Sequence, residues 1–173
     1  LPPPPDTHQP DLWGYITAQG ISRAEIQAPE RKRILCMAVT ASDTRDRGRP
    51  SSWSGALDQL TAGVEAEDED RVQRLVILCT GNLTDLEQAL AYPESQLNDS
   101  VHDPAHAWNA LTVGAYTALD RIEDKTYAGY EPIAAKNSLS PFSTTSCTWD
   151  NKWPLKPEIV MEGGNLAHDG NGF

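Results

Sequence analysis

The sequence predicts an α/β domain built on a mostly parallel sheet, and two observations support this. Continuous apolar runs of strand length occupy residues 33–40, 74–79 and 109–117. Stretches with apolar residues at helical spacing, 12–27 and 51–66, precede the first two of these runs. Helices that alternate with continuous apolar strands are typical of parallel sheets buried on both faces.

The first helix is expected over residues 12–27, because Leu12, Ile16, Ile21 and Ile26 fall on one helical stripe, although Gly20 weakens the pattern. Before it, the proline-rich residues 1–11 are predicted to be a stiff extended segment. The remaining residues, 12–173, have the length of a single domain.

The second helix is expected over residues 51–66, which open with serines that can cap a helix. Leu57, Leu60 and Val64 then continue at helical spacing. The acidic residues 67–70 are predicted to form a turn before the second strand. In the third strand, Gly114 marks a place where another backbone can approach closely. A last strand is expected within 156–165, which ends in glycines.

Charge and hydropathy argue against two kinds of partner. A net charge of −11 argues against nucleic acid, because phosphate binding needs clustered lysines and arginines. The short basic clusters at 31–33 and 45–49 are interspersed with aspartates and turn residues, so we interpret them as solvated surface. No apolar run approaches the roughly 20 residues of a membrane helix, so no membrane partner is expected.

Three cysteines, Cys36, Cys79 and Cys147, cannot all pair within the chain, and none has the CxxC spacing of a zinc or redox site. The first residues lack the basic start and apolar core of a signal peptide. The chain is therefore expected to begin as a mature protein or within a longer one. Unpaired cysteines favour a reducing, cytoplasmic location.

Candidate chemistry is sought at the carboxyl ends of the strands, because parallel α/β sheets place their sites there. Asn82 follows the second strand, where its side-chain amide can enter a crevice as a neutral donor. The alternative is an ordinary turn residue, since Gly-Asn pairs tolerate left-handed backbone angles.

A second candidate is a metal hydrolase site formed by His102, Asp103 and His106. Pro104 interrupts a continuous helix between the two histidines, and no third ligand is apparent nearby, so the sequence favours no metal. His168 and Asp169 lie among glycines and are interpreted as a loop. The GxSxG, GxxxxGK[ST] and GxGxxG motifs do not occur.

Six segments in order resemble the subtilisin-like serine peptidase (subtilase) family. "RILCMAVTA" resembles the family's "INMSLGG", and "LVILCTGN" resembles "VVVAAAGN". "HAWNALTVGAYT" is similar to "YPSVIAVGAVD", "LSPFSTTS" to "ASFSSVG", and "WPLKPEIVMEGGN" to "KPDVVAPGG". "SSWSGALDQLTAGVEA" stands where the family has a helix. The series spans about residues 30–165 and implies a subtilisin-like three-layer α/β/α fold, here as a partial domain.

The resemblance implies a role for Asn82 as the side-chain donor of an oxyanion hole. It also implies that Ala38, Val39 and Thr40 pair with the substrate backbone and form one wall of the first specificity pockets. The opposite wall would contain Cys79, Thr80 and Gly81. The family usually has glycine where Thr40 stands, so the pocket mouth is expected to be narrower. No cofactor is implied.

The chain departs from the family in its catalytic triad, whose order is Asp, His, Ser. No histidine here has an HG[TS] context and no serine a GTS context. We therefore interpret the chain as the central segment of a catalytic domain, between the His and Ser motifs. The parent protein would be a serine endopeptidase that cleaves peptide or protein substrates, and this chain alone would be inactive.

Two further expectations follow. A fragment without its flanking strands exposes sheet edges and apolar faces, so it is expected to self-associate. The alternative function is a non-catalytic subtilase-like α/β binding module, which would keep the architecture without the chemistry.

Overall fold

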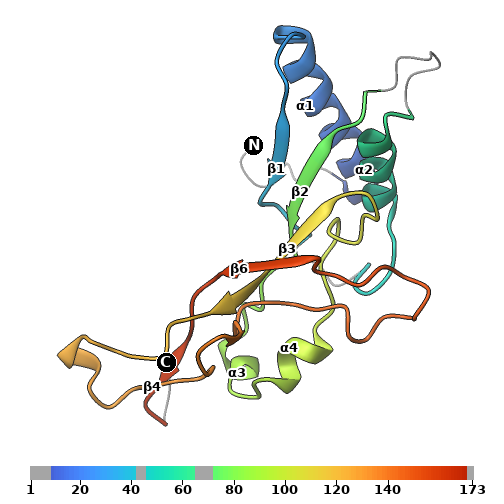
Figure 1. The fold of residues 1–173 in the computed structure, drawn as a ribbon. Coiled ribbons are helices and arrows are strands. Elements are labelled where there is room, and N and C mark those ends of the chain that lie inside the picture. Colours follow the sequence, from blue (N-terminus) through green and yellow to red (C-terminus); the bar gives the residue numbers. More distant parts are fainter. Residues whose placement is uncertain (1–8, 42–45, 65–71, 171–173) are drawn as a thin grey trace.

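The computed structural model describes residues 9–41, 46–64 and 72–170 (Figure 1). Most of the predicted proline-rich segment and the predicted acidic turn at 67–70 lie outside these ranges. Where the described chain begins, the backbone differs from the expected extended form, because Pro10–Leu12 make a short 3-10 helix that leads into α1.

A five-stranded, mostly parallel sheet forms the centre of the fold, as predicted. Strand β1 (Ile34–Met37) pairs in parallel with β2 (Leu75–Cys79), which pairs in parallel with β3 (Leu111–Thr117). Strand β6 (Ile159–Glu162) is parallel to β3, while the short β5 (Ser138–Leu139) joins the end of β3 in the antiparallel sense. The hydrogen-bonded strands are shorter than the apolar runs that predicted them.

Two helices, α1 (Trp13–Gln27) and α2 (Ser52–Ala62), lie side by side next to β1 and β2 (Figure 1). They approach closely at Gly14, where an added Cβ would lie 2.8 Å from that of Ala56. Of the stripe predicted for α1, only Ile21 is buried, and Ile26 is 75% exposed. The helix is therefore confirmed, but its packing depends on Gly14 and Ile21 rather than on the whole stripe.

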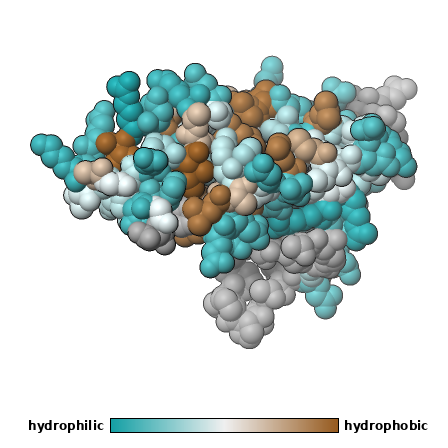
Figure 2. Space-filling model, turned by 90° about the horizontal axis from the view of Figure 1, so that it is seen from below, coloured by the Kyte–Doolittle hydropathy of each residue, from teal (hydrophilic) through white to brown (hydrophobic). Residues whose placement is uncertain are grey.

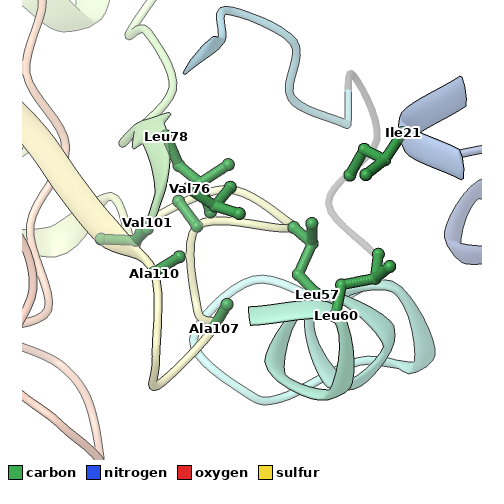
Figure 3. Packing of buried hydrophobic residues seen from close by; sticks show 9 residues of the cluster. Ile21, Leu57, Leu60, Val76, Leu78, Val101, Ala107 and Ala110 are labelled. Carbon is green, nitrogen blue, oxygen red and sulfur yellow. The ribbon is translucent and has the colours of Figure 1, made fainter. Parts of the chain in front are cut away.

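The core lies between α2 and the sheet. Leu57 and Leu60 of α2 extend toward the side where Val76 and Leu78 leave β2, and all four side chains are at most 2% exposed (Figure 3). Burying a leucine or valine side chain of this kind contributes about 1.5–3 kcal/mol. This core joins α2 to the central strand β2.

Both ends of α2 have clear local causes. The Ser51 hydroxyl accepts a hydrogen bond from the Ser54 backbone N–H (2.9 Å), and the Ser54 hydroxyl accepts one from the Ser51 N–H (2.8 Å). This reciprocal pair is a capping box. The helix ends earlier than predicted, because Gly63 adopts a left-handed conformation (φ 69°) that terminates it.

The other face of β1 and β2 carries no helix in the described ranges. Ile34 is 64% exposed and Leu75 is 45% exposed, and Cys36 is also exposed. Apolar residues reach the surface elsewhere as well (Figure 2). Of the three predicted layers, the described residues thus contain the sheet and the helices on one face.

Several small elements were not predicted. Helices α3 (Leu86–Ala89) and α4 (Glu94–Asn98) follow β2, and Lys125–Tyr127 form a 3-10 turn. Strands β4 (Glu131–Pro132) and β7 (Ala167–His168) pair as a separate two-stranded sheet. None of the helices in the described ranges has the length and apolarity needed to span a bilayer.

Candidate active site

The candidate site lies where β1 and β2 end beside each other. Met37, the last residue of β1, pairs with Leu78 of β2, so the next residues, Ala38 and Cys79, lie at the same edge of the sheet. In a parallel sheet, this carboxyl edge is where ligand sites form. The predicted substrate edge and the predicted donor strand are therefore neighbours.

A cavity of about 280 Å³ lies at this edge. Five of the seven predicted site residues line it: Ala38, Thr40, Cys79, Gly81 and Asn82. Four further residues complete the lining: Ala41, Arg47, Thr84 and His102. The cavity thus has one wall from the segment after β1, one from the segment after β2, and one from the chain around His102.

The other two predicted residues, Val39 and Thr80, do not line this cavity. Val39 is 59% exposed. Thr80 is buried, and its backbone N–H donates to the Val113 carbonyl (3.2 Å). The Thr80 carbonyl accepts from the His102 N–H (2.8 Å) and from the Thr144 hydroxyl (2.9 Å). Thr80 therefore fixes the end of β2 to three other segments.

Asn82 stands between two cavities. It lines the 280 Å³ cavity and also a second one of about 230 Å³, whose far side is formed by residues of β3 and β6. Its backbone forms an antiparallel bridge with Ser143, and Leu83 N–H donates to the Phe142 carbonyl (3.0 Å). The Asn82 side chain is exposed, and nothing in the described part of the chain hydrogen-bonds to it. Its amide is therefore free to donate to a ligand.

Gly81 brings the strand end against His102. Its φ is +94°, a conformation that other residues rarely adopt. A Cβ at this position would lie 2.5 Å from Nδ1 of His102 and closer still to the ring carbon Cγ. Only glycine allows this approach without displacing the imidazole.

Behind the cavity, Asp99 joins Arg47 and His102. The Arg47 guanidinium forms a short ion pair with the Asp99 carboxylate, and Nε2 of His102 lies 3.6 Å from the other carboxylate oxygen. Burial by itself would raise the pKa of Asp99, but His102 and the Arg47 guanidinium together outweigh it and lower that pKa below its ordinary value. Asp99 is therefore ionised at neutral pH.

The histidines at 102 and 106 do not form a metal site. Nε2 of His106 is 2.7 Å from the Val101 carbonyl, and its Nδ1 faces Asp103 at 3.5 Å, whereas His102 faces Asp99. Asp103 also accepts a hydrogen bond from the Ser51 hydroxyl. Within the described ranges, no three His, Cys, Asp or Glu side chains converge as metal ligands. The metal-hydrolase alternative therefore has no geometric support.

The fold and this site define an α/β domain with a cavity at the carboxyl edge of parallel strands. A sequence model of the subtilase family matches residues 4–172, so the chain belongs to the subtilase family. This confirms the resemblance and establishes a serine peptidase-like domain. Comparison with curated proteins and with solved structures found no match.

Sequence reasoning missed Arg47, His102 and Thr84 as cavity residues. Arg47 belongs to a basic cluster that the sequence led us to interpret as solvated surface, and His102 was considered only as a metal ligand. The ion pair of Arg47 with Asp99 brings Arg47 to the cavity. The two residues are 52 positions apart, so no local sequence pattern connects them.

Proposed function

We propose that this chain is the central part of the catalytic domain of a subtilisin-like serine endopeptidase. In this proposal, residues 38–40 pair with the backbone of an extended substrate. Asn82 donates a hydrogen bond to the carbonyl oxygen of the bond to be cleaved. Main-chain hydrogen bonds of this kind provide affinity, and pockets beside the edge provide selectivity.

One observation carries the proposal. Strands β1 and β2 are parallel neighbours that end together, so Ala38 and Thr40 face Gly81 and Asn82 across one cavity. A peptide lying along the first wall brings a carbonyl within reach of an amide on the second. An antiparallel or separated pair would have removed this possibility.

The chemistry expected of the whole protein is acyl transfer through a serine. As the nucleophile attacks, the carbonyl oxygen becomes negative, and the Asn82 amide stabilises this charge more strongly than it stabilises the neutral substrate. No hydrogen bond within the described residues engages the exposed Asn82 side chain, so its amide is available to donate. The oxyanion asparagine of subtilisin is the established case, where its loss costs about 10²- to 10³-fold in turnover.

The triad itself is proposed to lie outside these 173 residues. The sequence has no HG[TS] histidine and no GTS serine. In the described part of the chain, Ser51 donates to Asp103 rather than to a histidine, so it lacks the base that a nucleophile needs. The 173-residue chain by itself is therefore expected not to hydrolyse peptides.

The decisive experiment is Asn82→Ala in the full-length protein, with steady-state kinetics on a peptide substrate. Turnover should fall about 10²-fold or more with little change in KM, because the lost interaction belongs to the transition state. Asn98→Ala is the matched control, since Asn98 is an exposed asparagine in α4, outside both cavities. Kinetics unaltered by Asn82→Ala would remove the role assigned to this residue.

The binding-module alternative makes a different prediction. A module would bind peptides in the same cavity, but the full-length protein would not hydrolyse them. Sequencing the coding region on both sides of this segment distinguishes the two: Asp, His and Ser motifs in the family's order support the peptidase, and their absence supports the module.

Self-association of the 173-residue chain is proposed on the exposed sheet face. Ile34 and Leu75 are paired on neighbouring strands and are 64% and 45% exposed, and Met161 of β6, on the same face, is 58% exposed. Apolar surface of this kind on a sheet favours association with another copy.

A further inference from the structure

We propose that the 280 Å³ cavity selects an acidic side chain, so that the enzyme cleaves peptide bonds on the carboxyl side of glutamate or aspartate. This inference rests on the proposed function and adds a substrate class to it. Arg47 and His102 are the specificity-determining residues.

The position of the cavity identifies which substrate side chain enters it. Its walls are Ala38 and Thr40 on one side and Gly81 and Asn82 on the other. When a peptide lies along residues 38–40 with one carbonyl at Asn82, the side chain of the residue that carries this carbonyl faces the space between the walls. The cavity is therefore proposed to bind the side chain of the residue just before the bond that is cleaved.

The lining has a positive character. Of the described residues that line it, Arg47 alone has a permanent charge, and none is a carboxylate. Asp99 lies behind Arg47 and is not part of the lining. This distribution differs from the chain as a whole, which carries 25 acidic and 14 basic residues. A cation in the wall of a cavity in so acidic a protein favours an anionic ligand.

Two buried nitrogen atoms in this wall lack hydrogen-bond partners among the described residues. One is Nε of Arg47, which can only donate. The other is Nε2 of His102, which lies 3.6 Å from the Asp99 carboxylate. His102 is only 5% exposed. Unsatisfied buried donors are rare in folded proteins, because each costs free energy that a partner would recover.

A carboxylate fits this wall best. Its two oxygens only accept hydrogen bonds, so it can accept from the Arg47 guanidinium, which Asp99 engages through Nη1. The Thr40 and Thr84 hydroxyls add further donors at the same cavity. A leucine side chain would leave the nitrogens unpaired, and a lysine would place like charges together.

The test is a series of otherwise identical peptides that carry glutamate, aspartate, glutamine, leucine or lysine before the scissile bond. Each is assayed with the full-length protein. We expect kcat/KM for the glutamate peptide to exceed that for the glutamine peptide by about 10-fold or more, which is the contribution of a hydrogen bond to a charged group. The leucine and lysine peptides should be cleaved more slowly than the glutamine peptide. Equal or faster cleavage after glutamine, leucine or lysine would overturn the inference while leaving the peptidase function intact. No cleavage of any peptide would instead count against the proposed function.

Two variants link the preference to the residues. The double change Arg47→Gln with Asp99→Asn removes both members of the ion pair, so no buried charge is left alone. It should abolish the advantage of glutamate over glutamine, measured as the ratio of kcat/KM for the two peptides. Arg47→Lys should restore part of the preference, because it keeps the charge but not the planar donor geometry.

Arg121→Gln is the matched control, because it removes one positive charge from a side chain that is 84% exposed and lies outside the cavity. It should leave the glutamate preference unchanged. If the double variant keeps the full preference, or if Arg121→Gln reduces it equally, the selection does not come from Arg47 and the inference fails.

Discussion

Replacing Gly81 by alanine tests the geometry on which the site depends. The backbone at Gly81 has φ +94°, and forcing a residue with a Cβ into the left-handed region costs about 1–2 kcal/mol. The new methyl group would also overlap the His102 ring, with Nδ1 at 2.5 Å. The His102 backbone cannot move away easily, because its N–H donates a hydrogen bond to the Thr80 carbonyl (2.8 Å).

Overpacking of this kind adds about 1–3 kcal/mol to the backbone strain. Gly81→Ala should therefore lower the free energy of unfolding by about 2–5 kcal/mol, a large part of the stability of a typical domain. Equilibrium unfolding in urea, followed by tryptophan fluorescence, measures the change as a shift of the midpoint at constant slope. In the full-length protein, the same variant should lose activity, because Asn82 is the next residue.

Gly20→Ala provides the control. Gly20 lies within α1, its φ is not in the left-handed region, and a Cβ there would meet nothing within 4 Å. Alanine is favoured over glycine in a helix by about 0.5–1 kcal/mol, so this variant should be more stable than the wild type. If Gly81→Ala unfolds within about 0.5 kcal/mol of the wild type, the close approach of strand end and imidazole is not a real constraint, and the reasoning is refuted.

Three other predictions concern the cap, the buried ion pair and the open face. Ser51→Ala should destabilise the protein by about 1–2 kcal/mol through loss of the capping box, whereas the exposed Ser52→Ala should change little; equal effects would contradict the cap. Asp99→Asn should cost about 1–3 kcal/mol at pH 7, because it leaves the Arg47 guanidinium without its charged partner. Because the folded pKa of Asp99 is lowered, its stabilisation is complete above the unfolded value near 4 and is lost as pH falls through the folded one. The gap between wild type and variant in urea unfolding should therefore shrink on acidification, and a gap that grows would refute the assignment. The 173-residue chain should show concentration-dependent association in analytical ultracentrifugation, reduced by Leu75→Lys; a monomer at all concentrations would argue against the open sheet face.

The order of the main elements could be predicted because each leaves a local pattern. Continuous apolar runs predicted β1, β2 and β3, and the serines before 52–62 predicted the start of α2. General rules of α/β topology predicted parallel strands. The resemblance to subtilases, and not these local patterns, implied that Asn82 and residues 38–40 belong to one site.

The cavity wall could not be predicted in the same way. Arg47 comes from the loop before α2, and His102 comes from an irregular segment that follows α4. Neither segment has a periodicity, and the contact between them depends on Asp99, which is also in a loop. The short helices α3 and α4 were missed for a related reason: four or five residues are too few to show a helical repeat.

The hydrogen bonds at Thr80 make the end of β2 a fixed part of the candidate site. The Thr80 carbonyl accepts hydrogen bonds from the His102 N–H and the Thr144 hydroxyl, and the Thr80 N–H donates to the Val113 carbonyl. These bonds tie the end of β2 to three other segments. Arg47 reaches the cavity only through its side chain and its ion pair with Asp99. Under the role proposed for Arg47, a new substrate preference would need the exchange of one loop residue, while the end of β2 beside it stays fixed.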